Sequence, residues 1–438
     1  MLGSTDTKPG AGEARALWAL ALPVMVTQLL QMAMGVVDMV MLGHAGVQPM
    51  AAAVLANSYA FPSVMAGVGV VLGIDPLIAQ AHGAGDGEGI ALALQRGIVV
   101  ALGVSVPIMA LWYYAAPLLG LLGQPPELRD GAAEYLHMQV WSVPLFLLFM
   151  TLRQYLQGRG IVRPALLVLV AANVINALLD WALIFGHFGV PALGLRGAGI
   201  AAGLSRLADL LLLLAFIAVA RLHEGAWRPW SRRTFELARL RELLRLGLPI
   251  GVQWGFEVLA FGLVAVMAGW LNPRAVSAHA ICLNVASVTF MLPLGLAIGA
   301  ATRVGNTIGE GNPEAARRTA RLALAMTGGV MSCCALSIAA SHRVLPAAFS
   351  EDPGVIAVAA GLLPIAAMFQ IFDGTQVVCG GILRGMGRTR APAVGHFVGY
   401  YVLGLPVGYW LAFHAGWGVR GLWWGLLVGL VTVASLLL

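Results

Sequence analysis

The sequence predicts an all-α integral membrane protein, with twelve transmembrane helices in two six-helix bundles related by a pseudo-twofold axis along the membrane normal. The chain is 59% hydrophobic and only 11% charged, whereas a soluble domain carries roughly 25% charged residues. A spanning helix needs about 20 mainly apolar residues, so 438 residues with short loops provide about a dozen spans. An internal repeat, described below, divides these spans into two sets of six.

Apolar runs separated by glycine, proline and charge clusters predict the individual spans. Their expected bounds are 16–42, 50–81, 90–117, 130–158, 163–188, 195–221, 243–270, 276–308, 315–341, 353–386, 391–414 and 418–438. The predicted domains are a cytoplasmic N-terminal tail at 1–15, an N-lobe at 16–221, a linker at 222–242 and a C-lobe at 243–438. The arginines and tryptophans near the linker fit a segment lying along the cytoplasmic interface, and a solvated tether fits this composition equally well.

The two halves resemble each other at a nearly constant offset. Leu22-Pro23 is matched by Leu248-Pro249, 226 residues later. The same offset relates a set of glycines, namely Gly73, Gly83 and Gly85 to Gly299, Gly309 and Gly311. Because six spans return the chain to its starting side, both halves enter the membrane from the same side, which is the parallel-repeat arrangement of transporters.

The positions of the 26 lysines and arginines predict the orientation. Most lie in the N-terminal tail and in every second connection, a set to which we assign Arg153. The opposite connections contain Arg129, Arg196, Arg274, Arg343 and Arg420. The positive-inside rule therefore places both termini in the cytoplasm. The net charge of +6 then reflects topology, and no nucleic-acid partner is predicted.

Polar groups at the centre of a span are candidate functional residues, since inserting each charged one costs about 2.5–3.5 kcal/mol. Asp38 shares one face of the first predicted helix with Gln28 and Gln31, at helical spacing. The fifth predicted helix repeats the pattern with Asn173, Asn176 and Asp180. If the two faces meet, they form an oxygen-rich cavity in the N-lobe that suits protons or hard cations. Hydrogen bonds that merely join the helices are the alternative.

Two further acids are predicted inside spans of the C-lobe. Glu257 follows Gln253 by four residues, and Asp373 precedes a glycine in the tenth span. The nearest basic residues in sequence, Arg245 and Arg384, lie about three helical turns away. Because burial without a counter-charge disfavours the ionised form, these acids are expected to take up a proton or capture a cation.

Other polar residues in spans have structural interpretations. Arg206 and Asp209, three residues apart, predict an ion pair on one helix. We interpret His82, His279 and His396 as packing residues. Methionines crowd the Asp38 helix and offer an adaptable surface to varied ligands. They are Met25, Met32, Met34 and Met39.

Sequence motifs of enzymes are missing. The chain has no phosphate-binding loop, no HExxH and no GxSxG elbow. An enzyme is therefore not predicted, and neither is a cofactor. ATP-driven pumping would need such a loop, so the predicted energy source is an ion gradient.

Several motifs in order resemble the MATE family, particularly its NorM-type bacterial branch. They are Val-Asp-Met-Val-Met-Leu-Gly-His at 37–44, Ile-Ala-Gln-Ala-His-Gly-Ala-Gly at 78–85, Gly-His-Phe-Gly at 186–189, Phe256-Glu257, and Ile-Leu-Arg-Gly at 382–385. The resemblance covers essentially the whole chain. It implies a multidrug exporter of the bacterial inner membrane that exchanges Na+ or H+ for amphipathic, often cationic drugs or toxic metabolites by alternating access. The expected partners are thus these compounds, the coupling cation and the lipid bilayer, and the protein is expected to be a monomer.

Carried over by position, the resemblance also assigns roles to residues. Asp38 corresponds to the N-lobe acid of proton or drug coupling, with Asn173 and Asp180 as its polar neighbours. Glu257 and Asp373 correspond to the C-lobe acids associated with Na+. Having both sets leaves the coupling ion open. One departure is that the last helix stops at Leu438 without the polar cytoplasmic tail that we expect.

Two other functions remain as alternatives at this stage. A lipid-linked precursor flippase of the related superfamily would need a cavity lined by several arginines, yet almost all arginines are assigned to loops. An integral-membrane lipid-modifying enzyme would need clustered acids or histidines near an interface, whereas these acids are dispersed and deep.

Overall fold

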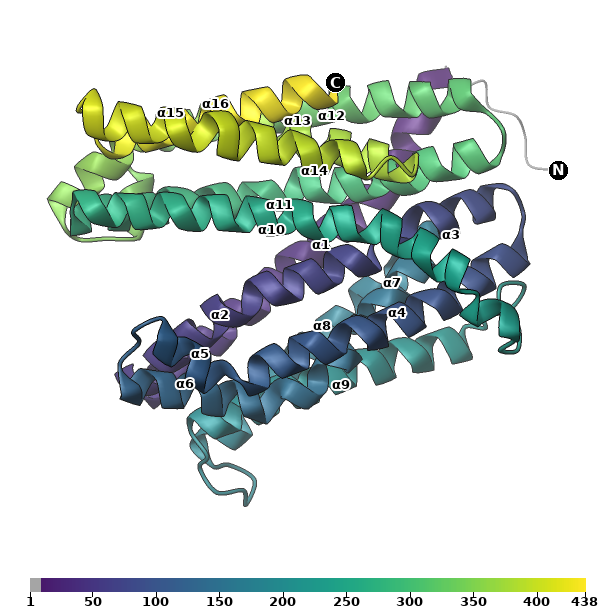
Figure 1. Ribbon diagram of the computed structural model, residues 1–438, viewed down its shortest axis with the longest axis horizontal. Helices are drawn as coiled ribbons and strands as arrows, with labels where there is room; N and C mark the ends of the chain where they lie inside the picture. Colours follow the sequence, from purple (N-terminus) through teal and green to yellow (C-terminus); the bar gives the residue numbers. More distant parts are fainter. Residues whose placement is uncertain (1–8) are drawn as a thin grey trace. The chain divides into compact units, whose positions relative to one another are not determined.

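The computed structural model describes residues 9–438, which fold into helices joined by short connections (Figure 1). Residues 1–8 of the predicted tail lie outside the described residues, and the first helix begins at Pro9. The first half of the chain contains α1 (Pro9–Ala45), α2 (Val47–Val71), α3 (Ile74–Gly83), α4 (Gly87–Tyr113), α5 (Ala115–Leu121), α6 (Pro126–Gln139), η1 (Val140–Ser142), α7 (Val143–Gly158), α8 (Arg163–Phe185) and α9 (Leu195–Val219).

The second half repeats this succession of long helices. A short turn, η2 (Arg232–Phe235), precedes it. It contains α10 (Leu237–Leu271), α11 (Pro273–Gly309), α12 (Pro313–Ser341), η3 (Leu345–Ala348), α13 (Pro353–Gly385), α14 (Arg390–His396), η4 (Phe397–Gly404), α15 (Leu405–Tyr409), η5 (Trp410–His414) and α16 (Val419–Leu437).

Eleven helical segments of the described chain are long and apolar enough to cross a membrane. The segment predicted as a span at 391–414 is the remaining one, and it is divided into α14, η4, α15 and η5, of which η4 and η5 are π-helical. Its glycines explain the irregular packing, because Gly399, Gly404 and Gly408 lie against the backbone of α16 at Gly425 and Gly429. Small residues let helix backbones approach closely in membrane proteins.

The described residues form two compact units. The N-unit is Val26–Gly251, and the C-unit combines residues 9–25 with Val252–Leu438. Two helices, α1 and α10, are therefore each divided between the units, and a proline stands close to each boundary, at Pro23 and Pro249. Both the prolines and the boundaries are separated by the 226-residue offset of the sequence repeat.

Each unit contains an equivalent close crossing of two helices. In the N-unit, Gly69 and Gly73 of α2 face Gly247 and Gly251 of α10, and a side chain at Gly73 would come within 2.8 Å of the Gly247 Cα. In the C-unit, the counterparts Gly295 and Gly299 of α11 face Met25 and Ala21 of α1. The repeat seen in the sequence thus extends to the packing of its helices.

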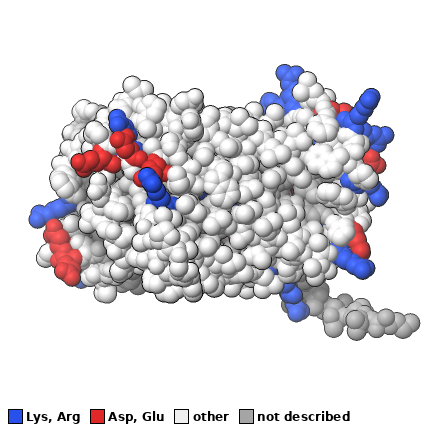
Figure 2. All heavy atoms as spheres, turned by 90° about the horizontal axis from the view of Figure 1, so that it is seen from below, with Lys and Arg blue, Asp and Glu red and all other residues white. Residues whose placement is uncertain are grey.

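Charged side chains gather at the ends of the helices on the face drawn in Figure 2, and the surface between them carries almost none. Large apolar side chains are exposed along that length of the helices, for example Val106, which is 64% exposed, and Leu178, which is 52% exposed. Such a band is the surface that hydrocarbon requires, since it leaves no charge in lipid.

Candidate functional site

The N-unit places three of the predicted site residues together, and we call Asp38, Asn176 and Asp180 the Asp38 cluster. The Asp38 side chain, from α1, lies near the Asp180 carboxyl and the Asn176 amide, both from α8. Asp38 Oδ1 and Asp180 Oδ2 are buried without a hydrogen-bond partner among the described residues. Asn176 Nδ2 also donates to Ser205 Oγ of α9 at 3.3 Å. Two carboxyls in contact cannot both carry a charge at low cost. A single proton between the two carboxyls would lower this cost.

Gln31 has a different partner. Arg153 Nη1 of α7 donates to Gln31 Oε1 at 3.2 Å, and Arg153 Nη2 donates to Gln28 Oε1 at 2.6 Å. The polar stripe of α1 is thus shared between a carboxyl of α8 and a guanidinium of α7. The assignment of Arg153 to a loop is wrong, because its side chain is only 5% exposed and points at α1.

Asn173 lies one turn before Asn176, and its amide bonds within its own helix. Asn173 Nδ2 donates to the Leu169 carbonyl at 2.8 Å. The side chain is half-buried. Although Asn173 is close to the Asp38 cluster in sequence, it has no described hydrogen bond to the two acids.

The predicted ion pair of Arg206 with Asp209 is not formed among the described residues. Arg206 Nη1 instead donates to Ser142 Oγ at 3.0 Å, and its guanidinium lies over the rings of Trp112 and Phe146. Asp209 is 5% exposed, and the positive charges of Arg206 and Arg153 act on it from a greater distance. The N-unit thus holds a buried arginine, Arg153, and a half-buried one, Arg206, near its acids.

The C-unit brings Glu257 of α10 and Asp373 of α13 together through a residue that the sequence did not reveal. Gln376 Nε2 donates to Glu257 Oε1 and to Asp373 Oδ1, both at 3.2 Å. Gln376 is 1% exposed, and its Oε1 has no hydrogen-bond partner among the described residues. The only local signal was its position one turn after Asp373.

His396 lies beside this group, and its interpretation as a packing residue stays a prediction. It is fully buried at the end of α14, with its Nδ1 at 2.7 Å from the Pro392 carbonyl. That bond requires a proton on Nδ1, so Nε2 presents a lone pair in the neutral ring. Nε2 lies 3.9 Å from Glu257 Oε2 and 3.5 Å from Gln253 Nε2. We call Gln253, Glu257, Asp373, Gln376 and His396 the Glu257 cluster.

The π-helical segment η4 supports the Glu257 cluster from one side. The Tyr401 hydroxyl donates to the Phe256 carbonyl at 3.0 Å, which ties η4 to the turn of α10 that carries Glu257. Tyr400 is fully buried one turn after His396. π-helical turns are frequent at functional sites. Within the described residues, no lysine or arginine forms an ion pair with Glu257 or Asp373.

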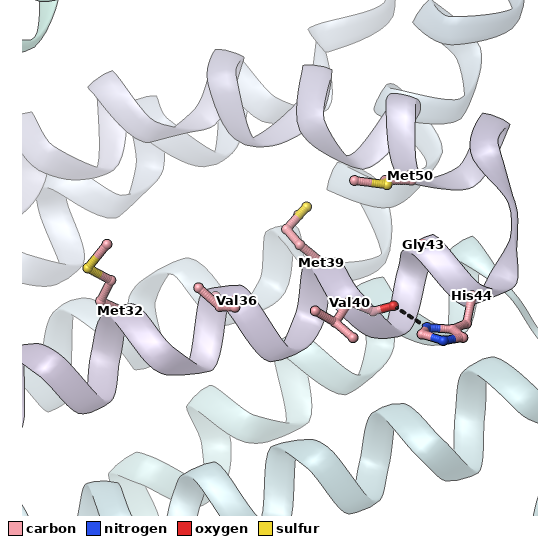
Figure 3. Close-up of a pocket in the computed structure, with 8 residues that line it drawn as sticks. Met32, Val36, Met39, Val40, Gly43, His44 and Met50 are labelled. Atoms are coloured by element: carbon pink, nitrogen blue, oxygen red, sulfur yellow. Dashed lines mark hydrogen bonds between the residues drawn. The ribbon is translucent and has the colours of Figure 1, made fainter. Parts of the chain in front are cut away.

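A groove of about 520 Å³ runs along α1 in the N-unit (Figure 3). Its lining residues are Met32, Gly35, Val36, Met39, Val40, Gly43 and His44 of α1 and Met50 of α2. His44 Nδ1 is held by the Val40 carbonyl at 2.8 Å, which fixes the ring at the end of the groove. Of the methionines singled out in the sequence, Met32 and Met39 line this groove, whereas Met25 is packed inside the C-unit.

Comparison with protein families finds one match, to the MatE family, at residues 23–182 and again at 249–410. The two matches begin 226 residues apart, as the internal repeat predicts. Multidrug resistance protein MdtK of Edwardsiella ictaluri is 34% identical over 430 residues, which cover 97% of this chain and 94% of that protein. Multidrug resistance protein NorM of Aliivibrio fischeri is 34% identical over 426 residues, covering 95% and 92%.

Solved structures show the same fold. The eukaryotic MATE transporter AtDTX14 matches with a TM-score of 0.89 and 26% identity, over 98% of this chain and 95% of that one. The Vibrio cholerae MATE transporter VcmN matches with a TM-score of 0.86 and 20% identity, over 98% and 96%. The all-helical, twelve-span fold predicted from the sequence is therefore confirmed.

Proposed function

Since this chain belongs to the MatE family and is a multidrug efflux transporter of the membrane rather than an enzyme, we propose that it is a secondary active antiporter. It exchanges inward-moving Na+ or H+ for amphipathic, often cationic organic compounds by alternating access. Protonation or cation binding biases the equilibrium between two arrangements of the lobes, because an ion shifts only an equilibrium between states that it binds unequally.

The observation that carries this proposal is the Glu257 cluster. Two carboxylates, Glu257, whose side chain is 18% exposed, and the buried Asp373, share the amide of Gln376 and lack a guanidinium or ammonium partner among the described residues. Buried acids without fixed counter-charges attract a cation or a proton. Carboxylate and amide oxygens are hard ligands of the kind that Na+ takes. We assign Na+ to this cluster.

The Asp38 cluster supports a different ion. One proton would stabilise the neighbouring carboxyls of Asp38 and Asp180, and the positive charges of Arg153 and Arg206 in the same unit offset negative charge. A metal cation at this cluster would be repelled by these two guanidinium groups, whereas a proton only neutralises one of the carboxylates. We assign H+ to this cluster, with Asn176 orienting the carboxyls.

The groove along α1 supplies an apolar surface, and its residues lie close to Asp38 in the sequence. Thioether side chains are flexible and polarizable, so they adapt to ligands of different shape. We propose that the apolar part of a substrate lies against Met32, Met39 and Met50. A lipid-linked precursor flippase is not favoured, because Arg153 and Arg206 donate to protein oxygens instead of lining this groove.

The remaining features of the proposal follow from the topology. The N-lobe at 16–221 and the C-lobe at 243–438 act as the two moving bodies. Both termini lie on the cytoplasmic side of the bacterial inner membrane, as the distribution of arginines indicates. No cofactor is needed besides the coupling ion, and a monomer suffices for transport.

Transport into inside-out vesicles, with Na+ and H+ gradients imposed separately, tests the proposal. Accumulation of a fluorescent organic cation should follow at least one of the two gradients and stop when both are collapsed. Vesicles without the protein correct for passive partition of the dye. Accumulation that depends on neither gradient would refute antiport.

A further inference from the structure

The linker between α9 and α10, residues 220–236, is fixed to the N-unit along α4. Gln95, fully buried on α4, donates its amide to the Arg228 carbonyl at 2.7 Å and accepts from the Thr234 hydroxyl at 2.5 Å. Arg96 donates to the Arg233 carbonyl at 2.9 Å. Buried side-chain bonds to a loop backbone leave it little freedom. The interpretation as a solvated tether is therefore not supported.

The first part of the linker is held as well. The hydroxyl of Tyr155 donates to the Leu222 carbonyl at 3.1 Å, and Arg159 also donates to this carbonyl. Ala226 is 2% exposed, and Gly87 at the start of α4 lies so close to the Gly225 carbonyl that no side chain fits there. One side of the linker thus packs against the N-unit along most of its length.

The other side of the linker is apolar and aromatic although it is exposed. Trp227 is 45% exposed, Trp230 46% and Phe235 58%. The rings of Trp230 and Phe235 lie 6.0 Å apart. Leu237, the first residue of α10, is 79% exposed. A soluble loop seldom presents so many large apolar side chains, whereas amphipathic rings are enriched where a membrane meets water.

Arginines interleave with these rings. Arg221, Arg233 and Arg239 form ion pairs with Glu224, Glu88 and Glu242. Arg228, Arg232 and Arg241 are exposed, and they form no ion pair within the part of the chain that the structure describes. The surface therefore carries free guanidinium groups, which bind phosphate oxygens with two parallel hydrogen bonds.

We propose that this surface, Trp227–Arg241, binds anionic phospholipid headgroups of the leaflet at which α9 ends and α10 begins. The position selects this occupant, because the segment joins two membrane spans that end at Val219 and begin at Leu237. Aromatic rings then enter the interface while the guanidinium groups meet the phosphates of an anionic surface. The inference is independent of the coupling ion.

Lipid binding to the purified full-length protein measures the charge component. Native mass spectrometry with phosphatidylglycerol, and with phosphatidylcholine as the neutral lipid, compares R228Q/R232Q/R241Q with wild type. Loss of three guanidinium groups should weaken phosphatidylglycerol binding about tenfold or more. The matched control is R317Q/R318Q/R321Q, which removes the same charge from an exposed arginine cluster of α12 without neighbouring aromatics. Equal losses in the two variants, or none, would overturn the proposal.

Fluorescence quenching measures the aromatic component. Other exposed tryptophans of the spans, such as Trp270 at 65%, are quenched by brominated lipid in every variant. In nanodiscs, W227F/W230F should therefore lose only the excess of quenching by brominated phosphatidylglycerol over brominated phosphatidylcholine. W410F/W417F removes two other exposed tryptophans, 58% and 52% exposed, and should keep it. Quenching of equal strength by brominated phosphatidylcholine would mean that the linker rests in the interface without selecting a headgroup. A tryptophan signal unchanged in W227F/W230F would place the linker in water or against a soluble partner. Each result contradicts the proposal.

Discussion

The Asp38 cluster and the Glu257 cluster each include an acid of the first helix of their half, α1 or α10, yet their acids lie at different positions of the repeat and have different neighbours. The acids of the N-unit are accompanied by the guanidinium groups of Arg153 and Arg206. The acids of the C-unit are accompanied by an amide and an imidazole. A duplicated helix framework can thus hold one site with its own counter-charges and one without.

Gln376 shows how the second kind of site remains stable when empty. Its amide donates two hydrogen bonds, one to each carboxylate, between Glu257 and Asp373, where we propose that Na+ binds. Its Oε1 is buried without a described partner. Rotation of the amide would exchange a donor for an acceptor, so that the same side chain serves both the empty and the ion-bound state.

The largest effect is expected from neutralising one acid in each cluster, which tests whether the two clusters use different ions. E257Q should lower the rate of Na+-driven export by about two orders of magnitude, and D38N should lower the rate of H+-driven export by the same factor. The amide keeps the size of the acid but cannot exchange a proton or offer a negative charge to a cation, and a hundredfold change corresponds to about 2.8 kcal/mol, since 1.4 kcal/mol is a factor of ten. Initial rates in vesicles under each gradient provide the measurement.

E351Q changes an exposed acid between η3 and α13 and serves as the matched control for expression and insertion. If both cluster variants, present at wild-type levels, exported a fluorescent cation at the wild-type rate, the mechanism would be wrong. If each variant lost Na+-driven and H+-driven export equally, the assignment of one ion to each cluster would be wrong instead.

A smaller effect is expected from Q376L, which keeps both acids and removes their bridge. The Na+ concentration for half-maximal transport should rise about tenfold, because a hydrogen bond to a charged group is worth about 1.5–3 kcal/mol. Q370L is the control, since Gln370 is equally buried on α13 but bonds to the Ala286 carbonyl. An equal shift in the two variants would assign the effect to packing of α13.

The smallest effect is expected in the groove. M39A should raise the KM of bulky apolar substrates about threefold and leave that of small ones nearly constant, because it removes apolar contact area of about 1 kcal/mol or less. M34A on the same helix lies outside the groove and provides the comparison. A uniform change across substrates, or a matching change in M34A, would contradict a role in substrate contact.

The sequence was sufficient for what depends on local spacing. Hydropathy located the spans, and the repeat at 226 residues reappeared as equivalent glycine crossings in the two units. Helical spacing also put Asn176 and Asp180 on one face, and the structure brings that face to Asp38. The roles of these residues in coupling remain predictions.

Partners that are distant in sequence could not be found in this way. His396 reaches Glu257 only because α14 packs beside α10, and no local pattern distinguishes it from a packing residue. Arg153 follows the rule for cytoplasmic arginines by its position, although Gln28 and Gln31 hold it inside the protein. The π-helical turns of the eleventh span depend on its contact with α16, which hydropathy does not report.

The division of α1 and α10 between the compact units also bears on the origin of the repeat. Each unit completes its core with a first helical segment that belongs, by sequence, to the other half: residues 9–25 in the C-unit and 237–251 in the N-unit. A single half would lack the segment that covers its glycines. A protein made of one repeat would therefore complete its core only with a second copy, as a homodimer that exchanges its first segments.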